Sequence, residues 1–304
     1  MSNKTHPFAS LNAFSTLLLD YLAAKPALQA FYGNAPQISH FKDQISKKKS
    51  FPSSSRAILQ TVLTEQYAAI GAEMPAVDLR DENTFTVTTG HQLNLYTGPL
   101  YVIYKLVSTI NLARALQKEY PNQRFVPVYW MATEDHDFEE INHFFAFGTK
   151  YEWTTSQKGA VGRFHLSDFP RIPLKNVIFD KAYSEGKTLS EAVRIYMHAL
   201  FGAEGLVCLD ADDARLKSLF APIMEADLNQ QVHEPIVRAT TEKLEALGYK
   251  TQVAAREVNL FRLTENDRIR LEKGDSVEMA DASPNVILRP LYQEVILPNL
   301  AYIG

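Results

Sequence analysis

The pattern of apolar residues between positions 84 and 137 changes its period twice. Residues 85–88 form a short β-rich run, whereas residues 99–118 place apolar side chains three and four positions apart, as in an amphipathic helix. Residues 125–131 are then a continuous apolar run, which is typical of a buried strand. Gly98 provides turn freedom, and Pro99 suits the first helical position. The pattern predicts a βαβ unit, whose strands should be parallel and whose crossover should be right-handed.

The whole chain divides into four predicted regions. A helical lead-in precedes the first half of a parallel-sheet core, a β-rich insertion follows, and the second half of the core comes last. The insertion is predicted because short aromatic runs alternate there with glycine-containing turns, one of them at 162–166. The four regions are residues 1–80, 81–143, 144–187 and 188–304, in that order.

Local patterns predict further elements in the lead-in and in the second half of the core. The lead-in has two helical stretches, and Ser53, Ser54 and Ser55 offer capping side chains for the second. The second half of the core is predicted as helix, buried strand, one or two long helices and a short strand. A hairpin-rich excursion with Asn-Asp and Lys-Gly turn pairs follows. The expected ranges are 11–32, 53–71, 188–203, 205–209, 214–247, 251–254 and 259–279.

Composition is that of an ordinary globular protein and excludes several classes. Of the 304 residues, 46% are hydrophobic and 22% are charged, and the formal net charge is −4. This balance gives no strong field for nucleic acid or an anionic membrane, and no apolar run reaches the ~18 residues of a spanning helix. The single cysteine, Cys208, rules out a disulfide framework and a cysteine-based zinc site within the chain. We therefore expect a cytoplasmic enzyme with neither nucleic-acid nor membrane partners.

The densest group of ionisable residues follows the apolar run at 125–131. Glu134, Asp135, His136 and Asp137 are consecutive, so three carboxylates and an imidazole would share one strand end. Ligands bind at the carboxyl ends of strands in open α/β sheets, and crowded ionisable groups have perturbed pKa values. The alternative is a helix N-terminus, with Thr133 as its cap and the acids facing the helix dipole.

A second motif is expected at the same edge of the sheet. Gly90 and His91 would lie in a loop between the first strand and the helix. This placement resembles the His-containing motif of class I aminoacyl-tRNA synthetases and related nucleotidyltransferases. In those enzymes the glycine lets the ATP base lie near the backbone, and the histidine hydrogen-bonds phosphate oxygens near a helix N-terminus. Alternatively, His91 is a loop residue without a role.

Several longer motifs occur in the order found in the bacillithiol biosynthesis cysteine-adding enzymes, which the chain resembles. The resemblance extends from about residue 85 to the last residue and more loosely before it. The motifs lie at 89–92, 96–101, 104–105, 127–137, 140–143, 206–210, 288–294 and 298–304.

The resemblance implies a Rossmann-like α/β core with connecting-peptide insertions, similar to class I synthetases and nucleotidyltransferases. It also implies a ligase that joins cysteine to the glucosamine amine of glucosaminyl-malate, the last step of bacillithiol synthesis, after ATP activates the cysteine carboxylate. Members of the family continue into a C-terminal coiled coil that carries a homodimer contact and helps to bind the nucleotide, ATP or ADP. Because the apolar run at 299–304 stops at a glycine, we expect this chain to be truncated before that coiled coil.

Side-chain chemistry combined with the resemblance suggests a role for each candidate. His91 would stabilise a phosphoryl or acyl oxyanion, and Gln92 would orient it. Either Asp135 or Asp137 would bind an ammonium group, and either Glu134 or His136 would be the general base for the attacking amine. The expected substrate and nucleotide contacts come from Gly90, Gln92, Gly98, Tyr101, Lys105, Arg289, Tyr292, Gln293 and Glu294.

The cationic and aromatic candidates each have a structural alternative. Arg289 could pair with a malate carboxylate or a phosphate, or else form an internal ion pair with Glu294 or Asp210. Lys105 could offer a point charge, or else it and Tyr101 belong to an ordinary helix face. The last three binding candidates, residues 292–294, would line the sugar pocket.

Three other functions compete with the ligase. A nucleotidyltransferase that adenylates a small cofactor precursor would share the Gly-His motif and release pyrophosphate without cysteine. A metal-dependent hydrolase could be built on the Glu-Asp-His-Asp cluster at 134–137. Asp135, His136, Asp137 and His143 could also be metal ligands, although nothing here supplies thiolates and we expect no metal. A nucleotide-sensing or scaffold domain would bind ATP without converting it.

Overall fold

The computed structural model describes residues 6–304, and its centre is a four-stranded parallel sheet. The strands are β1 (Thr84–His91), β2 (Arg124–Met131), β5 (Val207–Asp210) and β9 (Asn299–Ile303), in the spatial order β5-β2-β1-β9. Helix α4 (Leu100–Glu119) connects β1 to β2, whose strands are parallel. The Rossmann-like α/β core and its first βαβ unit are therefore confirmed.

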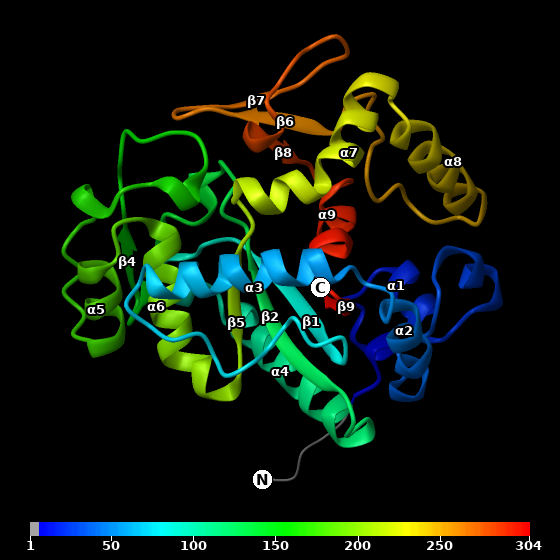
Figure 1. Cartoon of the computed structure of the whole chain (residues 1–304), viewed down its shortest axis with the longest axis horizontal. Helices are drawn as coiled ribbons and strands as arrows, with labels where there is room; N and C mark the ends of the chain where they lie inside the picture. Colours follow the sequence, from blue (N-terminus) through cyan, green and yellow to red (C-terminus); the bar gives the residue numbers. More distant parts are fainter. Residues whose placement is uncertain (1–5) are drawn as a thin grey trace.

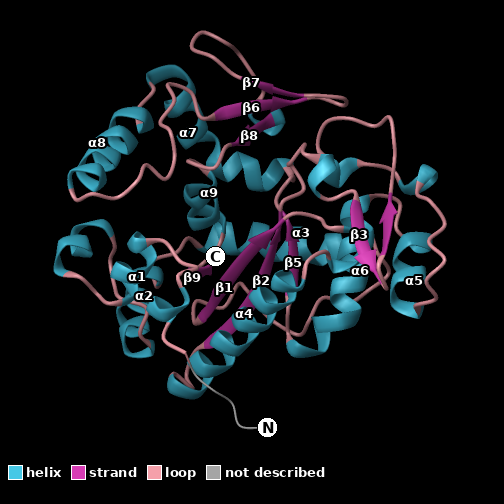
Figure 2. Ribbon diagram, turned by 180° about the vertical axis from the view of Figure 1, so that it is seen from behind, coloured by secondary structure: helices cyan, strands magenta, loops and turns pink. Residues whose placement is uncertain are grey.

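Helices cover both faces of this sheet. In β2, Val126, Val128 and Trp130 pack with α3 (Ser53–Ala68) and α7 (Ala214–Gln230) on one face. Tyr129 and Met131 pack with α4 and α6 (Leu189–Phe201) on the other. Helix α3 crosses in front of the sheet in Figure 1, and α4 lies in front of it in Figure 2. The run at 125–131 is apolar throughout because successive strand residues face opposite sides and both sides are buried.

Smaller elements surround the central sheet. The N-terminal helices lie beside β9, and a hairpin and a helix lie with α6 on the β5 side (Figure 1). A second sheet of antiparallel strands lies beyond the carboxyl ends of the central strands (Figure 2). These elements are α1 (Thr16–Leu22), α2 (Phe41–Lys48), β3 (His143–Ala146), β4 (Thr149–Glu152), α5 (Val177–Glu185), α8 (His233–Ala246), β6 (Leu260–Leu263), β7 (Arg268–Arg270), β8 (Ala282–Pro284) and α9 (Arg289–Ile296).

Most of the predicted helices form, as does the hairpin of β6 and β7, but several local predictions are wrong. Helix α3 begins at Ser53, and its N-cap is Pro52 without a side-chain cap, so the serines lie inside the helix. Residues 251–254 form no strand. The predicted β-rich insertion contains helix α5, whose first turn is capped by the Asn176 side chain. Pro99 is the N-cap of α4 rather than its first residue.

The strand expected at 162–166 is replaced by two short 3-10 helices, Val161–Arg163 and Leu166–Asp168. The backbone N–H groups of Val161 and Gly162 donate to the carbonyls of Asp135 and Thr133. Backbone pairing with the segment after β2 thus takes the place of a ladder with another strand. No helix within residues 6–304 is both long and apolar enough to cross a membrane.

Candidate active site at the carboxyl edge of the sheet

Strand register brings three strand ends together. His91 lies opposite Met131 in the β1–β2 pair, and Met131 lies opposite Asp210 in the β2–β5 pair. The segment 132–137 therefore leaves the sheet between His91 and Asp210. This edge faces the second sheet, formed by β6, β7 and β8 (Figure 2). It is the edge at which open α/β sheets bind their ligands.

His91 is the last residue of β1, not the loop residue that the sequence predicted, because the ladder with β2 continues through it. The ring nitrogen Nε2 lies 3.1 Å from the Tyr101 hydroxyl, and Nδ1 lies 2.9 Å from the side-chain nitrogen of Asn94. Nδ1 faces both the Asn94 amide nitrogen and, at 3.3 Å, the Gln92 carbonyl oxygen, and the shorter Asn94 contact favours the tautomer with the proton on Nε2. Burial lowers the pKa of His91, which favours this neutral form.

Gln92 contacts His91 only through its backbone carbonyl oxygen, 3.3 Å from Nδ1, and not through the side chain that was expected to orient the ring. Its side-chain nitrogen donates to Asp135 Oδ2 at 3.1 Å and also to a carboxylate oxygen of Glu140. Gln92 therefore joins the end of β1 to the segment that follows β2. Asn94, which the sequence did not single out, holds the histidine together with Tyr101, and its position three residues after His91 was its only signal.

Two glycines beside His91 allow close approaches. A Cβ on Gly90 would lie 2.2 Å from the Tyr302 hydroxyl oxygen. Gly98 has a φ of +64°, and a Cβ there would lie 2.4 Å from Cβ of Asn94, so this turn requires glycine. Lys105 Nζ donates to the Gly90 carbonyl at 2.8 Å. The Lys105 ammonium thus lies near His91 but is held by the backbone.

Asp135 is an ionised carboxylate held in place by fixed donors. Its Oδ1 accepts the backbone N–H of His136 at 2.8 Å, while Oδ2 accepts from Gln92. Burial alone would raise the pKa of Asp135, but these hydrogen bonds and the nearby charge of Arg268 lower it overall. A fixed negative charge in this position suits an ammonium ligand.

Glu134 belongs to a buried charge cluster that the sequence did not reveal. Lys217 of α7, whose side chain is 1% exposed, places Nζ 3.0 Å from Glu134 Oε1 and 2.7 Å from Asp212 Oδ1. Arg163 binds Asp212 through two nitrogens, at 2.7 and 2.9 Å. The Lys217–Glu134 contact is an ion pair without hydrogen-bond alignment, because Glu134 Oε1 has no hydrogen-bond partner among the described residues.

Burial and opposite charges act against each other in this cluster. Burial lowers the pKa of Lys217, but Glu134 and Asp212 raise it overall, so Lys217 stays protonated. Burial raises the pKa of Glu134 in spite of Lys217. Burial also raises the pKa of Asp212, but the hydrogen bond from Arg163 and the charge of Lys217 lower it overall. Of the two acids, Glu134 therefore takes up a proton more readily.

The alternative in which Thr133 caps a helix is wrong. Residues 132–137 form turns and irregular backbone, and Thr133 donates its hydroxyl proton to Asp210 Oδ1. Asp210 also accepts from Ser190 of α6 at 2.6 Å. Asp210 is thus a crosslink between β5, α6 and the segment after β2, which fixes where that segment leaves the sheet.

The structure separates the other two candidates of the 134–137 segment from this buried cluster. His136 and Asp137 are exposed. Nδ1 of His136 lies 3.3 Å from a terminal nitrogen of Arg268 in β7, and 3.5 Å from Asp135 Oδ1. Because a guanidinium only donates, a hydrogen bond between these two groups requires Nδ1 to be the acceptor.

The candidates at 289–294 do not share one pocket. Tyr292 is completely buried, and its hydroxyl donates to the Ala211 carbonyl at 2.8 Å. It therefore has a structural role and is not available to a ligand. Gln293 is also buried, and Glu294 pairs with Lys48 of α2. Arg289 therefore lacks the ion pair with Glu294 or Asp210 that its structural alternative required.

A cavity of about 680 Å³ lies beside His91, between the 92–101 segment and the β3–β4 hairpin. Ligand pockets commonly have this size. Six of its lining residues are Gln92, Asn94, Tyr101, Glu140, His143 and Phe145. Within residues 6–304, no three His, Cys, Asp or Glu side chains are grouped so as to hold a metal ion. His143, offered as a ligand, instead lies 2.9 Å from the Asn142 side-chain oxygen.

Comparison with known proteins gives one consistent result. The family model of the bacillithiol biosynthesis BshC N-terminal Rossmann-like domain matches residues 3–282 and 278–304. A Flavobacterium psychrophilum protein named "Putative cysteine ligase BshC" is 45% identical, over 96% of this chain and 62% of its own length. Proteins of the same name from Christiangramia forsetii and Cytophaga hutchinsonii are 41% and 40% identical, over 98% and 96% of this chain. The chain spans 61–63% of the length of these relatives.

Proposed function

Because the chain belongs to the family of bacillithiol biosynthesis BshC N-terminal Rossmann-like domains, we propose that it supplies the active site of a cysteine ligase. The reaction joins the carboxyl group of L-cysteine to the glucosamine amine of glucosaminyl-malate at the expense of ATP. The observation that carries the proposal is the convergence of His91, Asp135 and Glu134 at one sheet edge, beside a cavity of ligand size.

The chemistry requires two steps. A cysteine carboxylate oxygen attacks a phosphorus atom of ATP, which forms an acyl-adenylate or acyl-phosphate and releases pyrophosphate or ADP. The amine nitrogen of the sugar then attacks the acyl carbon, loses a proton to a base, and expels AMP or phosphate. Each step builds negative charge on oxygen, so a fixed hydrogen-bond donor at that position lowers the barrier.

The residues of the site suit these steps. In the tautomer that the Asn94 contact favours, neutral His91 can donate its Nε2 proton to a developing oxyanion in place of the Tyr101 contact. Ionised Asp135 can bind the substrate ammonium. The base is Glu134, whose pKa burial raises, or His136, whose imidazole is exposed beside Asp135. The cavity beside His91 is where we place the nucleotide.

Thiol profiling by mass spectrometry tests the proposal directly. Cells without the gene should lose bacillithiol and accumulate glucosaminyl-malate, and the intact gene should restore the thiol. Unchanged bacillithiol in a strain without a second enzyme for this step would contradict the proposal. Pyrophosphate release from ATP in the absence of cysteine would instead favour a nucleotidyltransferase. The homodimer and its coiled coil stay predictions.

A further inference from the structure

Arg268, which the sequence did not single out, approaches the site from the second sheet. It is the first residue of β7, and its guanidinium carbon lies 3.9 Å from the centre of the Phe261 ring in β6. This stacking fixes the plane of the guanidinium, since a cation over an aromatic face is attracted by the ring. From there a terminal nitrogen reaches His136 at 3.3 Å, so the hairpin places a positive charge over the 134–137 segment.

The Arg268 guanidinium has fewer hydrogen-bond and ion-pair partners than its burial would require. Its Nε is buried and has no hydrogen-bond partner among residues 6–304. Arg289, at the start of α9, lies close enough that its charge lowers the pKa of Arg268. Within residues 6–304, neither arginine has a carboxylate within ion-pair distance. Arg163, at the same edge, has two bonds to Asp212.

Burial of the Arg268 guanidinium is unfavourable, because only carboxylates beyond ion-pair distance, chiefly Asp135, offset its desolvation. Asp135 and Glu134 lie near enough to raise the pKa of Arg268, but Asp135 is already bonded to Gln92 and backbone, and Glu134 to Lys217. Arg268 therefore has planar donors available for an additional anion. Guanidinium groups bind carboxylate and phosphate oxygens bidentately.

We propose that Arg268 binds an anionic oxygen group of a substrate above the 134–137 segment, and that Arg289 adds positive charge nearby. This inference rests on the proposed function only for the source of the anion. Under that function the anion is either the malyl carboxylates of glucosaminyl-malate or the phosphates of ATP. In both cases the site would hold the ligand so that its reacting group lies near Asp135 and His136.

Calorimetric binding to the full-length polypeptide tests the site without requiring ligase activity. The probes are L-malate and ATP, each titrated into the wild type, Arg268→Gln and Arg270→Gln. Arg270 is the matched control, because it is exposed and lies over the same Phe261 ring at 5.0 Å. Loss of charge-assisted hydrogen bonds should weaken the bound probe roughly tenfold to a hundredfold in Arg268→Gln. The control should stay within about twofold of the wild type.

The malate and ATP titrations together identify the source of the anion. Weaker malate binding with unchanged ATP binding supports the site and assigns it to the carboxylates, and the reverse assigns it to the phosphates. Unchanged binding of both probes in Arg268→Gln, equal weakening in Arg270→Gln, or no binding of either probe by the wild type would overturn the proposal. A folded Arg268→Gln variant with the wild-type melting temperature is required, and Arg268→Lys replaces it if that variant unfolds. Normal malate binding in a protein without ligase activity would count against the proposed function alone.

Discussion

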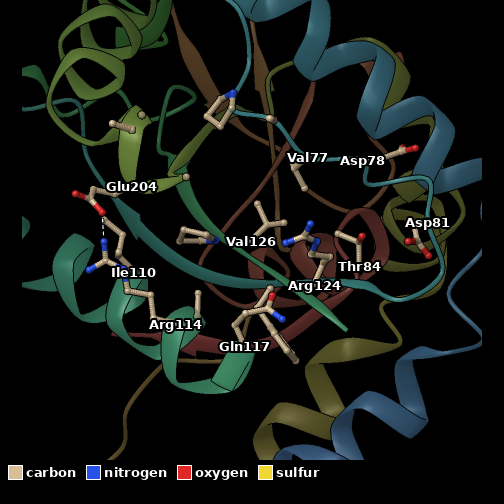
Figure 3. Close-up of a pocket in the computed structure, with 18 residues that line it drawn as sticks. Val77, Asp78, Asp81, Thr84, Ile110, Arg114, Gln117, Arg124, Val126 and Glu204 are labelled. Carbon is tan, nitrogen blue, oxygen red and sulfur yellow. Dashed lines mark hydrogen bonds and ion pairs between the residues drawn. The ribbon is translucent and has the colours of Figure 1, made fainter. Parts of the chain in front are cut away.

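The two ends of the central sheet carry charged residues in opposite ways. At the carboxyl edge, Lys217 is 1% exposed and Asp212 7%, and the charges are bonded between elements distant in sequence. At the amino edge, a cavity of about 550 Å³ is lined by the ends of α4 and β2 and by the loops before β1 and β5 (Figure 3). There Arg114 pairs with Glu204, and their side chains are 59% and 46% exposed.

A cavity of ligand size is therefore not by itself evidence of a catalytic site. The amino-edge cavity is of ligand size, but its one dashed contact in Figure 3 joins two solvated side chains. Such exposed pairs contribute little to stability. At the carboxyl edge, burial and fixed donors change the pKa values of Glu134, Asp135 and His91. Shifted pKa values in one cluster are what acid–base chemistry requires.

The largest expected difference between the edges concerns stability. Replacing Lys217 by Met leaves Glu134 and Asp212 buried without their shared cation, which should lower the free energy of unfolding by about 3 kcal/mol or more. Arg114→Gln breaks the exposed pair at the other edge and should cost less than about 1 kcal/mol. Urea unfolding followed by circular dichroism measures both variants. Equal losses of unfolding free energy in the two variants would show that burial does not make the Lys217 cluster more important for stability than the exposed pair.

The next effect concerns activity. Asp135→Asn keeps the size of the side chain but removes the charge, and should lower kcat/KM of the proposed ligase reaction roughly a hundredfold or more with little change in stability. Arg114→Gln serves again as the control and should retain normal kcat/KM. A variant that unfolds would indicate a structural role for Asp135, and an active one would remove Asp135 from the mechanism.

The smallest effect concerns pH, because each end of the sheet has a histidine whose pKa burial lowers. These are His91 at the carboxyl edge and His198 of α6, beside Gly202 at the amino edge. Their folded pKa values lie below the ordinary value of 6.5, so the unfolded chain binds protons that the folded chain does not. Stability should therefore fall as the pH drops from 7.5 to 5.5.

Urea unfolding at pH 7.5 and 5.5 separates the two contributions. His91→Gln and His198→Gln should each lose less stability between these pH values than the wild type does. Only His91→Gln should also lose activity at pH 7.5. If both variants lost as much stability as the wild type between these pH values, neither histidine would contribute to the pH dependence of unfolding.

The sequence predicted the core because hydrophobic periodicity is a local property. The apolar run at 125–131 and the helical spacing at 99–118 specify β2 and α4, and their order specifies the parallel connection. The short strands expected outside the central sheet were less predictable. A strand at 251–254 or 162–166 needs a partner strand, and sequence pattern alone does not show whether one is near.

The sequence by itself determined the βαβ unit of β1, α4 and β2, and the presence of His91 and the 134–137 acids at the carboxyl edge of the sheet. Only the tertiary structure decided what each of these side chains touches. It placed Lys217 between Glu134 and Asp212, turned Gln92 toward Asp135, and buried Tyr292 beneath the site. The physical reason is that pKa and reactivity depend on burial and on partners from distant parts of the chain, such as Lys217 and Arg268, which no local pattern encodes.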